Sequence, residues 1–184
     1  IKNIKNINNP TNKLILKKIK EIFFKEITST QIYSRENYKK ILEKNHNSNN
    51  WNIVVSESQT HGIGQHQKKW DSIDNNIYCT FMIPIKSSYL MFFNYITLIT
   101  GNSIRKLLKL YEINSQIKWV NDLYVKNKKI AGILCESITE GNNSVILIGI
   151  GINTNMTLKQ AVQKNLETDI NNSSEKIIEL EKEL

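Results

Sequence analysis

Two short stretches of the chain carry side chains suited to phosphate chemistry. The first, KWVND at 118–122, brings a lysine, an amide and a carboxylate together at the end of an apolar run. Mg²⁺ prefers oxygen ligands and often takes only one or two carboxylates, so an Asn-Asp pair at a strand end suits a metal bound to phosphates. An Asx turn would use the same two residues. Both interpretations stay open for Asn121 and Asp122.

The second stretch, KKIAGIL at 128–134, places Lys129 directly before an apolar run. A lysine there is usually a solvated turn residue. It can instead point into a site, where its compact ammonium group would neutralise a carboxylate or a phosphate. Downstream, GIGIN at 149–153 ends in small residues and an amide. Small residues let a flat ligand approach the backbone, and Asn153 can both donate and accept hydrogen bonds.

A third stretch, SESQTHGIGQHQKKW at 56–70, contains two alternate glycines, Gly62 and Gly64. Such glycines let backbone N–H groups turn toward an anion. The stretch is not a dinucleotide-binding fingerprint, because a third glycine is missing and no helix pattern follows. A flexible surface turn explains it equally well, so this stretch alone does not identify a ligand.

The elements that must position these motifs are mostly strands. A turn at Lys126–Lys128 would make 122–138 a hairpin, and the hydroxyls of TSTQ at 28–31 suit a helix cap. Pro84 indicates the edge of the pairing of its strand. We predict helices at 12–22, 33–45, 88–112 and 173–184, and strands at 22–27, 51–58, 75–85, 116–120 and 142–155. The class is therefore α+β, with a mixed, largely antiparallel sheet flanked by helices.

Composition predicts an ordinary globular protein. The 184 residues are 40% hydrophobic, enough for one domain with a core. We expect 1–12, rich in Asn, to be disordered, and 13–184 to form the domain. No apolar run approaches the roughly 20 residues of a membrane helix, and no secretory signal is visible. We therefore expect a cytoplasmic protein without membrane contact. Cys79 and Cys135, which lack a CxxC spacing, should be reduced core thiols.

The formal net charge of +8 does not by itself indicate nucleic acid. The lysines are spread along the chain among many Asn and Ile, and no cluster combines aromatic with basic residues. We attribute the charge to overall composition. A basic surface would also suit an acidic protein partner.

Each motif is ambiguous alone, but their order is not. SESQTHGIGQHQKKW, NNIYCTF, IKWVNDLYV, KKIAGILCES and IGIGINTN follow one another at spacings that resemble the catalytic domain of biotin protein ligases. TSTQ resembles the Ser-Thr-Asn element upstream in that family. The resemblance covers about 22–156, and KWVNDLYV with KKIAGIL is its most specific part. It implies the biotin/lipoate ligase fold, which is like that of class II aminoacyl-tRNA synthetases.

The resemblance implies an ATP- and Mg²⁺-dependent enzyme that converts biotin to biotinyl-5′-AMP. It would then transfer biotin to a lysine of the biotin carboxyl carrier domain of a biotin-dependent carboxylase. Lys129 would contact the biotin carboxylate and phosphate oxygens, while Asp122 would hold Mg²⁺ with Asn121 beside it. The further binding residues implied are Ser29, Thr30 and Gln59 for the ureido ring, Gly62, Ile63, Gly64 and Gln65 around the acyl phosphate, Trp70 and Asn153 at the adenylate, and Gly132, Gly149 and Gly151.

The chain departs from the family pattern in its loop. The family usually has arginines where this chain has Ile63 and Gln65, and a glycine in place of Gln67. The proline between Trp and Asn is replaced by Val120. Backbone contacts to a ligand survive such changes, but contacts from the two charges do not. We therefore expect either an active ligase with a looser hold on the adenylate or a decaying copy.

The chain also ends 31 residues after Asn153, where family members continue into a small β-barrel. There is no room for the helix-turn-helix domain that some members carry, so we expect the monofunctional type without DNA binding. A non-catalytic or weakly active remnant is one alternative, and a lipoate or octanoyl transferase of the same fold is another. Family members often dimerise edge to edge through the sheet, which the sequence neither requires nor excludes.

Overall fold

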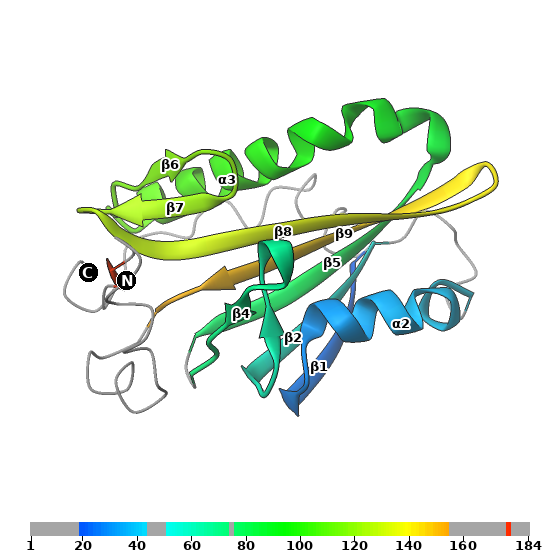
Figure 1. Cartoon of the computed structure of the whole chain (residues 1–184), viewed down its shortest axis with the longest axis horizontal. Helices are drawn as coiled ribbons and strands as arrows, with labels where there is room; N and C mark the ends of the chain where they lie inside the picture. Colours follow the sequence, from blue (N-terminus) through cyan, green and yellow to red (C-terminus); the bar gives the residue numbers. More distant parts are fainter. Residues whose placement is uncertain (1–18, 44–50, 74–75, 155–175, 178–184) are drawn as a thin grey trace.

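A large sheet dominates the computed structural model, which describes residues 19–43, 51–73, 76–154 and 176–177 (Figure 1). Within these residues the sheet has eight strands. Its strands are β1 (Ile19–Ile27), β2 (Trp51–Gln59), β5 (Ile77–Lys86), β6 (Gln116–Lys118), β7 (Asp122–Val125), β8 (Lys128–Glu140), β9 (Asn143–Ile152) and β10 (Lys176–Ile177).

The strand order is β1-β2-β5-β9-β8-β7-β6, with β10 beside β8. β1 pairs with β2 in parallel, as a crossover through a helix allows. From β2 to β6 the path is antiparallel throughout. The predicted α+β class with a mixed, largely antiparallel sheet is thus confirmed.

Two helices cover opposite faces of the sheet, as Figure 1 shows. α2 (Thr30–Glu43) packs on β2, β5 and β9, while α3 (Phe93–Leu110) packs on β6, β7 and β8 and follows the 3₁₀ helix η2 (Ser87–Phe92). Apart from the sheet, β3 (Gly62–Ile63) and β4 (Lys69–Trp70) form a small hairpin around the 3₁₀ turn η1 (Gln65–Gln67).

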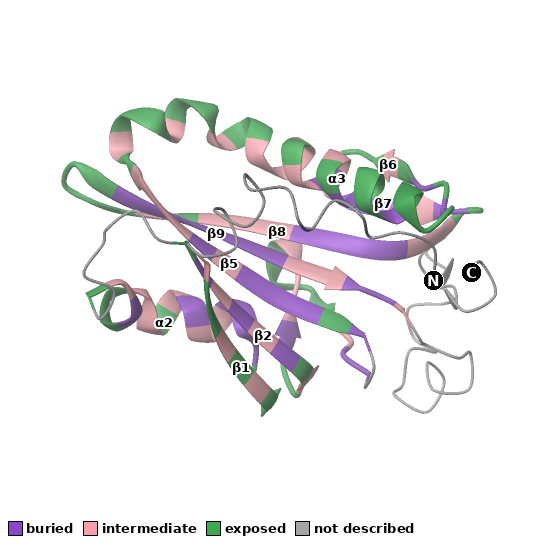
Figure 2. Ribbon diagram, turned by 180° about the vertical axis from the view of Figure 1, so that it is seen from behind, coloured by how far each residue is buried: buried purple, intermediate pink, exposed green. Residues whose placement is uncertain are grey.

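The two helices explain why β9 is apolar almost throughout. Leu147 and Val145 face the α2 core with Met82 and Val54, while Ile146 and Ile148 face the α3 core. Since both faces are covered, the strand does not alternate between apolar and polar residues. Buried residues accordingly concentrate along the central strands in Figure 2.

The predicted strands and the 122–138 hairpin are confirmed, with small shifts at their ends. β6 is shorter than predicted and ends at Lys118. The hairpin turns through Lys126 and Asn127, both at positive φ. The pairing of β5 with β2 ends at Met82, two residues before Pro84, while its pairing with β9 continues to Lys86.

Two helix predictions were wrong where the structure describes them. The predicted 12–22 helix overlaps β1 at Ile19–Ile22, because pairing with β2 overrides the helical pattern there. The predicted 173–184 helix contains β10 at Lys176–Ile177 instead. β10 pairs with Lys128 and Lys129, where β8 extends beyond the end of β9 and leaves one edge open. The predicted disorder of 1–12 lies outside the described residues.

Both cysteines are free. Cys79 is a buried residue of β5, and the desolvation of its thiol raises the pKa of that thiol to about 12. Burial also raises the pKa of the half-buried Cys135, against a hydrogen bond from Thr97 that lowers it. No helix of the described part is long and apolar enough to span a membrane.

The packing of the α2 core predicts that two Leu→Ala substitutions will differ strongly in their effect on the free energy of unfolding. Leu147 is fully buried, whereas Leu110 at the end of α3 is 80% exposed. We expect Leu147→Ala to lower the free energy of unfolding by about 2–5 kcal/mol because it leaves a cavity. Leu110→Ala should change it by less than about 0.5 kcal/mol. Urea unfolding followed by circular dichroism measures both, and equal effects would contradict the assignment of the core.

Candidate active site

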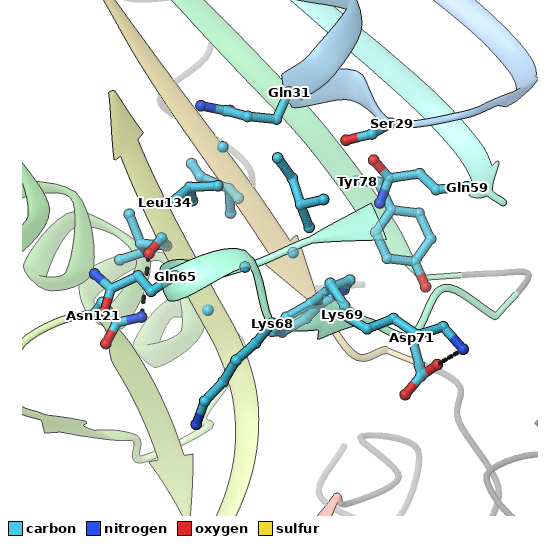
Figure 3. A pocket seen from close by; sticks show the side chains of 18 of the residues that line it. Ser29, Gln31, Gln59, Gln65, Lys68, Lys69, Asp71, Tyr78, Asn121 and Leu134 are labelled. Atoms are coloured by element: carbon cyan, nitrogen blue, oxygen red, sulfur yellow. Dashed lines mark hydrogen bonds and ion pairs between the residues drawn. The ribbon is translucent and has the colours of Figure 1, made fainter. Parts of the chain in front are cut away.

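A cleft of about 550 Å³ opens on the α2 face of the sheet. Gly149 lies two residues after the core residue Leu147 and so on the same face. Figure 3 shows Ser29, Gln31 and Gln59 on one side of the cleft and Lys68, Lys69 and Asp71 on the other. The residues predicted from sequence that line it are Ser29, Thr30, Gln59, Ile63, Gly64, Gln65, Trp70, Asn121, Asp122, Lys129, Gly132, Gly149, Gly151 and Asn153.

The floor of the cleft is one row of residues across four strands. Asp122 on β7 pairs with Gly132 on β8, Gly132 pairs with Gly151 on β9, and Gly151 pairs with Tyr78 on β5. The row therefore places two adjacent glycines between a carboxylate and a phenol.

Trp70 lies flat against this glycine pair. A Cβ at Gly132 would come within 2.6 Å of the Trp70 ring, and a Cβ at Gly151 would do the same. Any larger residue would push the indole away. The ring also comes close to Lys129, whose Nζ lies 5.2 Å from its centroid, within the range of a cation–π contact.

Lys129 and Asp122 form an ion pair with Nζ and Oδ2 3.0 Å apart. Their side chains are only 18% and 11% exposed, so removal of either would leave the other charge poorly solvated. The second oxygen of Asp122, Oδ1, is buried and has no hydrogen-bond partner among the residues that the structure describes. A carboxylate oxygen without a partner fits a hard cation such as Mg²⁺, which takes few protein ligands when phosphates supply the rest.

A chain of hydrogen bonds orders the other end of the cleft. Thr80 donates to the Thr30 hydroxyl at 3.0 Å, and both N–H and hydroxyl of Thr30 donate to Gln59 Oε1, at 2.8 and 3.2 Å. Gln59 Nε2 then donates to Ser72 at 2.9 Å. Ser29 instead caps α2 from the position before it, and its hydroxyl accepts from the N–H of Ile32 at 3.4 Å, as the predicted cap requires.

The two amides near the floor are held by backbone carbonyls. Asn121 Nδ2 donates to the carbonyl of Ile133 at 3.3 Å, and Asn153 Nδ2 donates to that of Lys129 at 3.4 Å. The Oδ1 atom of Asn153 is buried and has no hydrogen-bond partner within the described part of the chain. These bonds fix both side chains at the cleft, with an acceptor of Asn153 unused.

Gly62 is the one predicted site residue that does not line the cleft. It packs instead against the backbone of Trp70, and a Cβ there would come within 3.0 Å of Gln59 Nε2 and of Ser72 Oγ. Its role in this structure is thus to let the β3–β4 hairpin close over the hydrogen bond from Gln59 Nε2 to Ser72 Oγ.

Sequence reasoning missed several residues of the cleft. Lys68 and Lys69 line it, with Lys69 Nζ 2.9 Å from Asp71 Oδ1. Their position at the basic end of the stretch 56–70, directly before Trp70, was a usable signal. The cleft keeps basic residues although Ile63 and Gln65 are neutral. Also missed were Gln31, His66, Asp71, Tyr78, Ile133, Leu134 and Ile150.

Comparison with known proteins decides the family. The model of the biotin/lipoate A/B protein ligase family matches residues 23–153. The chain belongs to this family. The bifunctional ligase/repressor BirA of Bacillus subtilis is 31% identical over 113 residues, which make up 60% of this chain and 35% of that protein.

Solved structures of the family agree. The biotin protein ligase of Aquifex aeolicus in complex with biotin and ATP is 29% identical, with a TM-score of 0.58 over 74% of this chain and 53% of its own. That of Leishmania major in complex with biotinyl-5-AMP is 25% identical, with a TM-score of 0.58 over 75% of this chain and 57% of its own. The resemblance to biotin protein ligases is thereby confirmed. The chain spans about a third of the Bacillus relative and little more than half of each solved structure.

The glycine floor makes a prediction about Trp70. Gly151→Ala should displace the indole and lower the free energy of unfolding by about 1–3 kcal/mol through overpacking. In a Trp51→Phe, Trp119→Phe background, the fluorescence of Trp70 should shift to the red as the ring becomes hydrated. Gly64→Ala is the control, because its Cβ would meet only the carbonyl of Lys68, at 3.5 Å. An unchanged spectrum in Gly151→Ala would contradict the packing.

The backbone of η1 makes a second prediction. His66 and Gln67 adopt φ of 56° and 60°, and both side chains are exposed. Left-handed backbone is costly for a residue with a Cβ, so Gln67→Gly should raise the free energy of unfolding by up to about 1 kcal/mol. Gln65→Gly, at a residue without positive φ, should lower it by roughly 0.5–1 kcal/mol. Thermal unfolding of the two variants checks the signs, and a loss of stability in Gln67→Gly would refute the argument.

Proposed function

We propose that this chain carries the catalytic cleft of an ATP-dependent biotin protein ligase. It would activate biotin to biotinyl-5′-AMP and transfer the biotinyl group to a lysine of a biotin carboxyl carrier domain. The observation that supports this most is the Lys129–Asp122 ion pair at the edge of the glycine floor. A half-buried cation beside an unshared carboxylate oxygen suits the crowded negative charge of nucleotidyl transfer.

The first step needs no nucleophile from the protein. The carboxylate of biotin attacks the α-phosphorus of ATP, a P–O bond to biotin forms, and the bond to diphosphate breaks. Lys129 would neutralise the biotin carboxylate and a phosphate oxygen, and this charge stabilisation would matter most in the transition state. Asn153 would offer its unused Oδ1 to a donor of the nucleotide.

Magnesium fits this site through Asp122. The unpartnered Oδ1 of Asp122 would hold the ion, with Asn121 beside it. Bound Mg²⁺ would supply charge neutralisation at the phosphate oxygens. Groups of three or more His, Cys, Asp or Glu that could hold a metal do not occur among the described residues, so most of its ligands would come from ATP and water.

The second step depends on position. The amine of the acceptor lysine attacks the acyl carbon, AMP leaves, and the amine loses a proton. Holding the lysine amine next to the acyl carbon lowers the barrier by position alone, so this step needs no catalytic residue at that carbon. The net charge of +8 would favour the approach of an acidic carrier domain. Trp70 would cover the adenylate from the hairpin side.

The test is diphosphate release that depends on both biotin and ATP. We expect Lys129→Ala to lower kcat/KM by about 100- to 1,000-fold, as for loss of one transition-state charge contact. Lys106→Ala, which removes an exposed charge from α3, is the matched control and should leave the rate unchanged. Absence of release by the folded wild-type chain, or equal rates for the two variants, would refute the proposal.

A further inference from the structure

The amide of Gln59 can face the cleft in only one way. Its Oε1 accepts from the N–H of Thr30 at 2.8 Å and from the Thr30 hydroxyl at 3.2 Å. The N–H of Thr30 lies at the start of α2, where it has no partner within the helix. A flipped amide would place its own N–H groups against this donor. The oxygen of Gln59 is therefore fixed toward α2.

Ser72 fixes the other end of the same amide. Gln59 Nε2 donates one hydrogen to Ser72 Oγ at 2.9 Å. Ser72 is only 3% exposed, and Gly62 lets the hairpin close over this contact because a Cβ there would come within 3.0 Å of both atoms. A rotation of the amide would break bonds to both Thr30 and Ser72.

One hydrogen-bonding position then remains for a ligand. An amide has two donor hydrogens and two acceptor lone pairs. Thr30 uses both lone pairs and Ser72 uses one hydrogen, and Gln59 has no further partner within the described residues. Since Gln59 lines the cleft, the group that it can offer a ligand is an N–H donor.

We infer that Ser72 is a positioning residue that, with Thr30, locks Gln59 as a hydrogen-bond donor, so that this end of the cleft selects a carbonyl acceptor such as that of a cyclic urea. The inference rests on the proposed function, which brings the ureido ring of biotin to Gln59. It assigns a role to Ser72, which does not line the cleft, and a direction to the Gln59 bond.

The first arm of the test removes the lock. Ser72→Ala frees the Gln59 amide, and we expect the Kd for biotin to rise about three- to tenfold, the effect of one hydrogen bond. The KM for biotin should rise likewise while kcat stays unchanged, since the lost contact acts in ground state and transition state alike. Ser58→Ala is the control, because its hydroxyl bonds Lys25 and Glu26, away from the cleft.

The second arm reverses the polarity of the contact. Gln59→Glu keeps the shape but removes both donor hydrogens. The wild type should bind biotin at least about tenfold more tightly than protonated 2-iminobiotin, whose ring bears a donor in place of the carbonyl. In Gln59→Glu this preference should disappear or reverse. This arm decides the matter if Ser72→Ala does not fold.

Calorimetry of biotin binding separates this inference from the proposed function. Unchanged biotin affinity in folded Ser72→Ala, or an unchanged preference in Gln59→Glu, would overturn the inference while diphosphate release could still occur. Biotin binding with the expected effects but without diphosphate release would overturn the proposed function alone. Failure of the wild type to bind biotin would overturn both.

Discussion

The site depends on the absence of side chains at Gly132 and Gly151. The two residues pair across β8 and β9 in the middle of the sheet, where glycine is unfavourable because it packs poorly. Trp70 offsets this cost, since its ring covers the backbone that both glycines leave bare. The same contact holds the β3–β4 hairpin over the cleft. The position of the indole also brings its ring close to Lys129 on β8. The position of the hairpin places Gly62 over the hydrogen bond between Gln59 and Ser72.

Much of this arrangement was readable in the sequence. The pattern of strands and helices predicted the fold class, the order of the motifs predicted the family, and nearly all of the residues singled out for the site line one cleft. The hairpin at 122–138 followed from a simple turn signal. The hairpin was readable because β7 and β8 follow one another in the chain and are joined at Lys126 and Asn127. The residues of the cleft lie on strands as far apart in the chain as β5 and β9, and it was the family resemblance that grouped them.

The failures share a cause. Ile19–Ile22 forms a strand because β2 offers it a parallel edge, and β2 lies some thirty residues away in the chain. No local pattern contains that partner. The packing of Trp70 on two glycines from other strands is likewise a long-range contact. The same holds for Ser72, whose importance lies in its bond to Gln59 and not in its own neighbours in sequence.

The stretch 56–70 shows why the charge at one or two positions is a poor guide to the charge of the whole cleft. Ile63 and Gln65 line the cleft without charge, yet Lys68, Lys69 and Lys129 line it too. Two of these lysines are already paired, Lys69 with Asp71 and Lys129 with Asp122. A ligand phosphate would have to compete with those carboxylates, or share Asp122 through a cation. The balance of fixed charge at the cleft is thus set by the acidic partners as much as by the uncharged Ile63 and Gln65. The affinity for an anion should depend on how readily Asp71 and Asp122 release their lysines.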